Sequence, residues 1–366
     1  MGTLLAAHYN ALVAAMRVLY DGWPLLYAPE SAEALHLRTL LALAQEDLEL
    51  LLALPVGVEI ETNSKKIRNV LAETHDQGAW QQRVLPRLAE EQQADWVHTT
   101  QLAATLFGKA PTLVSPASSD LSDSGSHSLR GRIAAAQGRG GLARATILWP
   151  EDLPDPNLPG TLRKLPPVAH PDFQPGKAMP PVGLELPEEY LLYHGAGDQG
   201  ALLRLLESWT WAAASIGELY PLVMLGLDEE AKRFLEKRLP EFHVQDSVHL
   251  LPQVDAQHLP AIYQNCIAVV HPGPPAPWGG TLRHGLACGK AIVAHQEALT
   301  EAMVGPAAYL ISSDDLRAFG AAIITVAVDE KAREKLEAAA NQRSASWKAI
   351  AFQIELKHVM EKARKV

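Results

Sequence analysis

At 366 residues the chain exceeds the roughly 250 to 300 residues at which a single hydrophobic core stops growing, so we expect two domains. Its hydrophobic fraction of 48% and charged fraction of 20% are ordinary for a globular protein. A formal net charge of -10 argues against a nucleic-acid partner and against strong attraction to an anionic membrane. No apolar run reaches the roughly 18 residues that a membrane-spanning helix needs.

The chain holds two cysteines, Cys266 and Cys288, and both lie inside apolar segments. This usage predicts reduced thiols and a cytoplasmic location. Residues 1–15 are mildly apolar but lack the cationic start and the cleavage context of a signal peptide. We expect them to form an extension outside a core fold that begins at Met16.

The N-terminal half alternates between strand-like and helix-like segments, an order that predicts a parallel α/β sheet. The segments 50–54 and 56–60 fit either a strand or the end of a helix. A polar, low-complexity loop covers 115–130, and dense prolines over 149–187 mark a domain boundary. The expected strands are 16–21, 95–98, 112–114 and 142–148, and the expected helices are one from Ser31, two at 62–75 and 81–93, and a small one between 98 and 112.

The C-terminal half repeats the same alternation of strands and helices. The last helix is expected from Trp347 to Glu361, with apolar residues at broadly helical spacing: Ile350, Ile354, Leu356 and Val359. The other expected elements are strands at 190–195, 220–225, 248–251 and 267–270 and helices at 202–214, 229–237 and 255–265.

Residues 266–296 contain the clearest candidate site. An apolar run predicts a buried strand, a loop rich in proline and glycine follows, and 282–288 predicts a short helix that Thr281 can cap and Gly289 can end. A strand, a glycine-rich loop and a helix N-terminus form an anion site, because unpaired amides and the helix dipole face the loop. We therefore expect the amides of Gly279, Gly280 and Thr281 to bind a phosphate.

This stretch resembles the donor segment of the family-four retaining glycosyltransferases (glycosyl transferase group 1), which have the GT-B fold. The loop 272–279, the helix residues 284–289 and the strand at 291–293 keep the frame of that family's motif, but its two glutamates are replaced by Ala276 and His284. The resemblance implies an α/β fold of two Rossmann-like domains that face a central cleft. It divides the chain into an extension (1–15), an acceptor-side domain (16–165), a linker (166–187), a donor-side domain (188–346) and a returning helix (347–366).

The resemblance also assigns residues to the two sides of the cleft. His284 is either a ligand for a ribose hydroxyl or a helix-surface histidine, and Arg283 is either a replacement cation or a solvated residue. The family's Arg and Lys pair is absent from 195–200, Ser119 stands where the family has a histidine, and Trp278 is expected to pack beneath the loop. No catalytic residue is identified. The implied donor-binding residues are Gly195, Gly279, Gly280, Thr281, Arg283 and His284, and the implied acceptor-side residue is Asp120.

Two functions stay open on these residues. The chain transfers a sugar from a nucleotide-sugar donor to a sugar or lipid-linked acceptor, as a retaining hexosyltransferase. Alternatively, it is a catalytically inactive pseudo-glycosyltransferase that acts as a partner of a glycosyltransferase subunit or as a nucleotide-binding subunit. The expected ligand is a nucleotide sugar or a nucleoside diphosphate. The histidines show no metal-binding motif, so we expect no metal and no cofactor.

Overall fold

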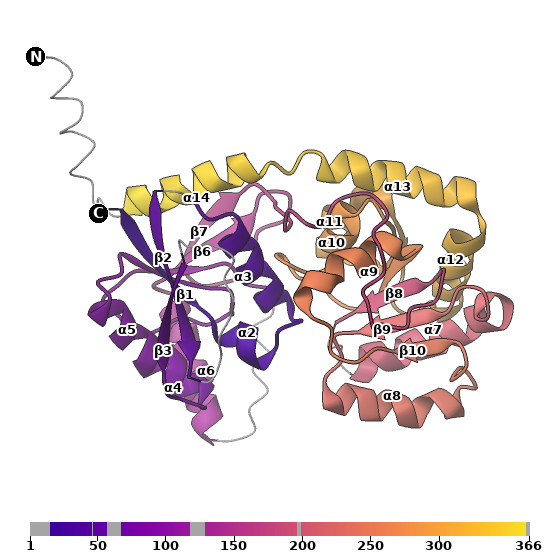
Figure 1. The fold of residues 1–366 in the computed structure, drawn as a ribbon, viewed down its shortest axis with the longest axis horizontal. Helices are drawn as coiled ribbons and strands as arrows, with labels where there is room; N and C mark the ends of the chain where they lie inside the picture. The colour runs from indigo at the N-terminus through magenta and orange to yellow at the C-terminus, as the bar shows by residue number, and fades with distance from the viewer. Residues whose placement is uncertain (1–14, 46, 57–66, 118–128, 196–198, 364–366) are drawn as a thin grey trace, which may run out of the picture.

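The computed structural model describes residues 15–45, 47–56, 67–117, 129–195 and 199–363, although not the side chains of 129–135 and 363. It consists of two β-sheets with helices packed around them, which lie side by side as two α/β domains (Figure 1). Among the described residues every strand pairing in both sheets is parallel. This confirms the predicted architecture of two Rossmann-like domains.

The first domain contains a sheet with the order β3-β2-β1-β4-β5-β6-β7. Its central strands β1 and β2 are apolar and almost wholly buried, as a parallel sheet covered on both faces requires. The strands are β1 (Met16–Asp21), β2 (Leu48–Pro55), β3 (Ile67–Ala72), β4 (Trp96–Thr99), β5 (Thr112–Val114), β6 (Thr146–Pro150) and β7 (Thr161–Leu165). The helices are α2 (Trp23–Tyr27), α3 (Ala32–Ala42), α4 (Gln77–Ala79), η1 (Trp80–Val84), α5 (Leu85–Glu91) and α6 (Leu129–Leu142).

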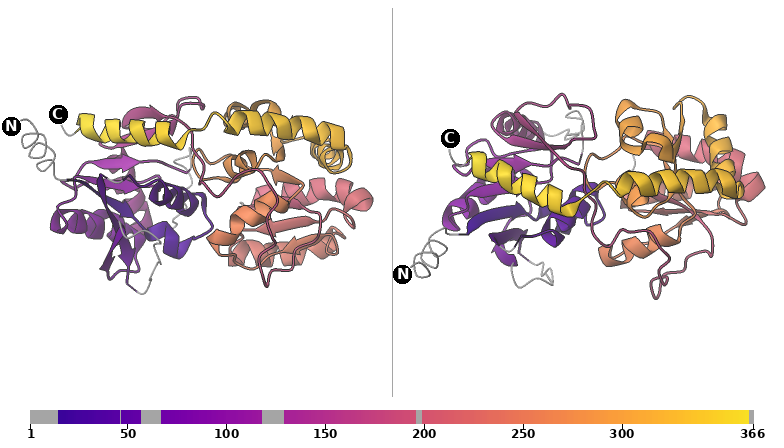
Figure 2. Two further views of the ribbon diagram at one scale, coloured as in Figure 1. Left: turned by 45° about the horizontal axis from the view of Figure 1, so that its top comes forward. Right: turned by 90° about the horizontal axis from the view of Figure 1, so that it is seen from above.

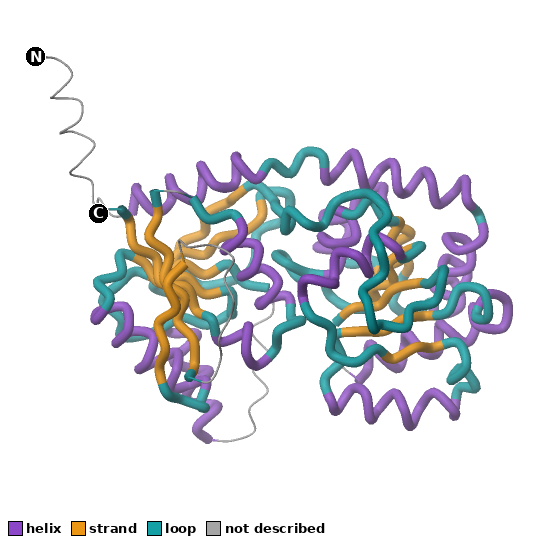
Figure 3. The backbone as a smooth tube through the Cα atoms, viewed as in Figure 1, coloured by secondary structure: helices purple, strands orange, loops and turns teal. Residues whose placement is uncertain are grey.

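The second domain contains a sheet with the order β10-β9-β8-β11-β12-β13. The two groups of strands are separate in Figure 3, where loops and helices lie between them. The strands are β8 (Leu191–His194), β9 (Leu222–Leu225), β10 (Val248–Leu250), β11 (Ala268–His271), β12 (Ala291–His295) and β13 (Ala308–Ile311). The helices are α7 (Gln199–Ile216), α8 (Glu229–Glu241), η3 (Ala256–His258), α9 (Leu259–Asn265), α10 (Thr281–Ala287), α11 (Ala298–Val304), η4 (Gly305–Ala307), α12 (Leu316–Val328), α13 (Glu330–Ser344) and α14 (Ala349–Ala363).

The last helix, α14, leaves the second domain and packs on the first (Figure 2). The Gln353 side chain donates to the carbonyl of Leu43 at 2.8 Å, and Lys357 forms an ion pair with Asp47. Of the four apolar residues expected at helical spacing, Leu356 and Val359 are buried, together with Phe352 and Met360. Ile350 and Ile354 face outward and are 70% and 59% exposed.

Two other predictions for the first domain are wrong. Within the helix expected at 62–75, residues 67–72 form the strand β3 and 73–75 form a loop, and no helix lies between β4 and β5 in the described residues. Strand β3 is at the edge of the sheet and exposes three of its six side chains, so its sequence lacks the apolar run of a central strand. The undecided segment 50–54 belongs to strand β2, whereas 57–60 lies outside the described residues.

Candidate functional site

The carboxyl ends of the parallel strands define the site, because the loops and helices that follow those ends converge there. In the second sheet the adjacent strands β8, β11 and β12 end at His194, His271 and His295. The loop between α2 and α3 of the first domain reaches this edge, where the Glu30 carboxylate accepts a hydrogen bond from the Val254 amide. The carboxyl edges of the two sheets therefore face each other across the domain interface.

Helix α10 begins at this edge, with Gly280 as its N-cap. The Thr281 hydroxyl donates to the carbonyl of His194 at 2.6 Å, so it ties α10 to the end of β8. The predicted side-chain cap is therefore wrong, because Thr281 is the first helical residue and its hydroxyl bonds the sheet. Gly289 has φ +69°, which confirms the predicted C-terminal glycine. The first i−4 bond runs from the His284 amide to the Gly280 carbonyl, so the earlier amides of the helix have no partner within it.

Gly279 and Gly280 are both required by packing. Gly279 has φ +62°, and a Cβ there would lie 2.5 Å from the carbonyl oxygen of Ala32 and 2.6 Å from the amide nitrogen of His36 on α3. A Cβ at Gly280 would lie 2.5 Å from the Cβ of Ala276. One side of the glycine loop is therefore filled by the first domain, and any anion must approach α10 from another side.

The Arg283 side chain is completely buried and already paired. Its Nε donates to the carbonyl of Pro277 at 2.6 Å, and its guanidinium bonds the Asp152 carboxylate at 2.9 Å and 3.3 Å. The rings of Trp278 and Trp347 lie 5.9 Å and 5.3 Å from its Cζ atom. Because Asp152 follows β6, this pair joins the two domains. The expectation of a solvated Arg283 is wrong, and the side chain reaches a donor phosphate only if the pair opens.

The His284 side chain is 1% exposed, so it is not a helix-surface histidine. Phe173 of the linker stacks on its ring with the centroids 4.0 Å apart, and the Tyr263 ring meets it edge-on at 5.7 Å. Burial lowers the pKa of His284 well below its usual value, and Nδ1 has no hydrogen-bond partner among the described residues. A ribose contact through this ring requires Phe173 to move.

Two glycines at the same edge have open space beside them. Among the described residues, a Cβ at Gly273 would have no heavy atom within 4 Å, and a Cβ at Gly195 would meet the Tyr193 hydroxyl at 3.8 Å. Gly195 follows β8 and Gly273 follows β11, the next strand in the sheet. At the end of β11 the Nδ1 atom of His271 is buried without a partner in the described part of the chain. Open space beside an unsatisfied polar atom is typical of a ligand site.

A cation near this edge, Arg204, was not predicted from the sequence. Arg204 lies in the second turn of α7, the helix that follows β8. Its Nε is buried with no hydrogen-bond partner among the described residues. Burial first and the Arg204 charge second lower the pKa of His295, which places the guanidinium near the end of β12. The signal was present in the sequence, because Arg204 follows a glycine-containing turn at the start of a helix.

The carboxyl edge of the first sheet holds a buried carboxylate that the sequence also did not reveal. Asp21 ends β1 and is 0% exposed. Burial raises its pKa, and the hydrogen bonds that it accepts act in the opposite direction. Its donors are Trp80 Nε1 at 2.8 Å, Gln101 Nε2 at 2.8 Å, the Thr99 hydroxyl at 2.9 Å and the Trp23 amide at 3.1 Å.

Other predicted features are either outside the described residues or away from the cleft. Asp120 of the acceptor side is outside them, as are residues 196–198 of the loop after β8. Within the described part of the chain, no group of three or more His, Cys, Asp or Glu side chains is arranged to hold a metal ion. No helix among the described residues has the length and apolar character to cross a membrane.

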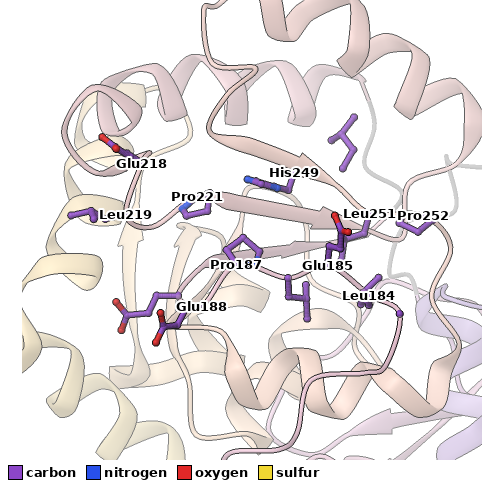
Figure 4. A pocket seen from close by; sticks show the side chains of 14 residues that line it. Leu184, Glu185, Pro187, Glu188, Glu218, Leu219, Pro221, His249, Leu251 and Pro252 are labelled. Atoms are coloured by element: carbon purple, nitrogen blue, oxygen red, sulfur yellow. The ribbon is translucent and has the colours of Figure 1, made fainter.

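A hollow of ≈ 940 Å³ lies against the edge strand β10, between the end of the linker and the segment before β9 (Figure 4). Its lining includes the acidic side chains Glu185, Glu188 and Glu218. Carboxylates repel a phosphate, so this hollow is poorly suited to a nucleotide. The open edge near Gly195 and Gly273 fits an anionic ligand better.

Comparison with known proteins agrees with this geometry. Residues 203–343 match the family model "Glycosyl transferases group 1". No curated protein matches the chain. Two Rossmann-like sheets with facing carboxyl edges define the GT-B fold. The family match lies within the second domain and includes residues 266–296, whose resemblance to this family was noted from the sequence.

Solved structures show the same fold along nearly the whole chain. Sucrose-phosphate synthase from Thermosynechococcus elongatus superposes with a TM-score of 0.69 at 14% identity, covering 95% of this chain and 99% of that one. WaaG, a glycosyltransferase involved in lipopolysaccharide biosynthesis, gives 0.69 at 14% identity and covers 95% and 98%. HepE from Anabaena, solved in complex with UDP and glucose, gives 0.67 at 12% identity and covers 94% and 99%. At these identities the likeness shows the GT-B fold.

Proposed function

We propose that this chain binds a nucleoside diphosphate sugar at the carboxyl edge of its second sheet and transfers the sugar to a sugar or lipid-linked acceptor. The observation that carries the proposal is that the described residues leave open space beside Gly195 and Gly273, at the ends of two adjacent strands. The N-terminus of α10 lies at the same edge, and its dipole favours a negative charge there. The group 1 match supports a nucleotide-sugar donor, and HepE was solved with UDP at a site of the same fold.

Two groups of this chain serve the diphosphate in the proposed complex. The amides of the first turn of α10 donate hydrogen bonds, and Arg204 supplies a positive charge. During transfer an acceptor hydroxyl oxygen bonds to the anomeric carbon while the bond from that carbon to the diphosphate oxygen breaks, and the hydroxyl proton passes to an oxygen of the leaving diphosphate. Negative charge grows on the leaving diphosphate, so Arg204 and the amides stabilise the transition state more than the ground state.

A specific observation also favours the non-catalytic alternative. The family's two glutamates are Ala276 and His284 in this chain, His284 is covered by Phe173, and Arg283 is held by Asp152. These replacements remove groups that hold the donor sugar and ribose in the related enzymes. In this alternative the chain binds a nucleotide diphosphate, or a partner glycosyltransferase subunit, without turnover.

The decisive experiment measures binding and turnover separately. A thermal-shift panel of UDP-, GDP-, ADP- and TDP-sugars identifies the donor, because ligands that bind the folded state raise the unfolding midpoint. Donor hydrolysis and transfer are then measured with that sugar nucleotide. Turnover of about 1 per second or more supports the enzyme. Binding without turnover supports the alternative. A panel without any shift contradicts the enzyme and the nucleotide-binding form of the alternative, and leaves the partner subunit as the function.

The role of Arg204 is tested by Arg204→Gln, with Arg233→Gln on the exposed part of α8 as the matched control. Losing one charge-assisted hydrogen bond costs about 1.5 to 3 kcal/mol, which weakens nucleotide binding by roughly ten- to a hundredfold. The control variant is expected to bind as the wild type does. Equal affinity of Arg204→Gln and the wild type contradicts the assigned role.

We also propose the domain division 16–165 and 188–346, joined by the linker 166–187 and by the helix 347–366 that returns to the first domain, with residues 1–15 as an extension. A cytoplasmic location is proposed with it. Cys266 and Cys288 are free and buried, and burial raises the pKa of the Cys266 thiol to about 12. Such thiols are unreactive and suit a reducing compartment.

A further inference from the structure

The interface between the two domains contains a histidine with no hydrogen-bond partner. His36 on α3 is 0% exposed, and neither of its ring nitrogens has a partner among the described residues. Buried polar atoms are nearly always paired, so an imidazole with two unpaired nitrogens is unusual. The neutral ring tolerates this environment far better than a protonated ring would.

His36 is in contact with the second domain. Its ring stacks on Trp278 with the centroids 5.0 Å apart and the planes at 12°. The α3 backbone at the same residue lies against Gly279. The Trp278 indole also donates to the carbonyl of Leu148 in the first domain at 3.0 Å. His36 and Trp278 are therefore central to the contact that holds the domains together.

The charged and titratable groups that act on His36 are cationic or basic. Besides burial, His98 of β4 and Arg283 and His284 of α10 lower its pKa. We call His36, these three side chains and Trp278 the histidine interface. Burial, His194 of β8 and His170 of the linker lower the pKa of His284 in turn. Burial and the charge of Arg38 on α3 lower the pKa of His170.

The nearby carboxylates are already occupied. Asp152 pairs with both Arg283 and Arg343. Asp21 accepts four hydrogen bonds, and the Glu30 carboxylate accepts one from the Val254 amide. A proton on His36 would therefore add a positive charge beside Arg283 without a free carboxylate to balance it.

We propose that the histidine interface is an acid-sensitive latch, in which protonation of His36 separates the two domains at mildly acidic pH while both sheets stay folded. Opening exposes the His36 ring to water, where its charged form is solvated. Each sheet consists of strands of its own domain, so the domains are able to part without breaking a strand pairing. Opening also exposes apolar side chains that pack across the interface, among them Leu35, Trp149 and Trp278.

The sign of the pH dependence follows from proton linkage. Burial lowers the pKa of His36 and of His284 well below the usual 6.5, and lowers that of His98 to about 3. In the closed state the His36 ring is neutral at every pH above its lowered pKa. In the open state this ring, no longer covered by Trp278, takes up a proton as the pH falls below about 6.5, so it shifts the equilibrium towards opening by up to about tenfold per pH unit.

The test follows the radius of gyration by small-angle scattering from pH 8 to pH 5, alongside far-ultraviolet circular dichroism on the full chain. If the latch opens as proposed, the radius of gyration rises first as the pH falls, and secondary structure is lost only at a lower pH. His36→Phe keeps an aromatic ring against Trp278 but cannot be protonated, so its opening should move to lower pH by at least about half a unit. His249→Phe, the same exchange at an exposed histidine of β10, should open as the wild type does.

A second variant, Asp152→Asn, tests the latch even if His36→Phe does not fold. Asp152→Asn removes a negative charge that faces Arg283, so the interface should open at higher pH than in the wild type. The latch is overturned if the two wild-type transitions coincide. It is equally overturned if His36→Phe opens at the wild-type pH, or if Asp152→Asn does not raise the pH of opening.

Discussion

The carboxyl edges of the two sheets have the same place in the fold but opposite polar chemistry. In the first domain Asp21 is buried and accepts hydrogen bonds from four donors. In the second domain His271 and Arg204 each keep a buried nitrogen unpaired among the described residues, beside the open positions of Gly195 and Gly273. A satisfied buried network stabilises the fold, whereas unsatisfied groups beside open space favour a ligand. The difference indicates that the first edge is built for stability and the second for binding.

The largest expected effect is on stability, from Asp21→Ala at the first edge. The substitution leaves four donors without their acceptor, and breaking a buried network of this kind costs about 3 to 5 kcal/mol. Urea unfolding of the variant measures the loss. Asp246→Ala, at an exposed position of the second domain, is the control and should change the stability by less than about 0.5 kcal/mol. A loss of stability in Asp21→Ala no larger than that of the control would contradict a stabilising role for the first edge.

Substitution of Arg283 distinguishes the domain interface from the binding edge, because it should change stability but not nucleotide affinity. Arg283→Met keeps the length of the side chain but removes its pair with Asp152, so we expect a loss of about 3 kcal/mol in stability. Nucleotide affinity, measured by calorimetry on the folded variant, should change by less than about twofold, or roughly 0.4 kcal/mol. A variant with normal stability and much weaker nucleotide binding would instead make Arg283 a donor ligand.

A smaller effect is expected at Thr281, where the hydroxyl bonds the carbonyl of His194. Thr281→Val preserves the side-chain volume and leaves that buried carbonyl unpaired, at a cost of about 1 to 2 kcal/mol in stability. The amide of residue 281 is unchanged, so nucleotide affinity should stay the same. Chemical unfolding and calorimetry on one preparation measure both. A large loss of affinity without a loss of stability would show that the hydroxyl itself contacts the ligand.

Local sequence signals were sufficient for the segment from β11 to β12. Its apolar runs and the glycine that ends α10 depend on neighbouring residues, and both are observed. Strand β3 was mistaken for a helix because an edge strand carries no continuous apolar run. The GT-B fold was predictable from that one segment, since it is typical of a known family.

The environment of the site residues could not be predicted, because it depends on residues far away in the sequence. Arg283 pairs with Asp152 at a separation of 131 positions, and the donors to Asp21 include side chains 59, 78 and 80 positions away. His284 is covered by Phe173 from the linker. Residue type gave the chemistry of each side chain, but only the packing shows which side chains are already engaged.

Calorimetry with Gly273→Val shows whether a nucleotide binds at the open edge of the second sheet. A side chain at this position meets no described atom within 4 Å, so the fold should tolerate it and the unfolding midpoint should stay unchanged. Gly280→Val is a poorer test, because it would collide with Ala276 before it met a ligand. We predict that UDP or GDP binds the wild type and that Gly273→Val weakens this binding by at least about tenfold, with Gly273→Ala in between. Wild-type affinity in a folded Gly273→Val variant would contradict the account.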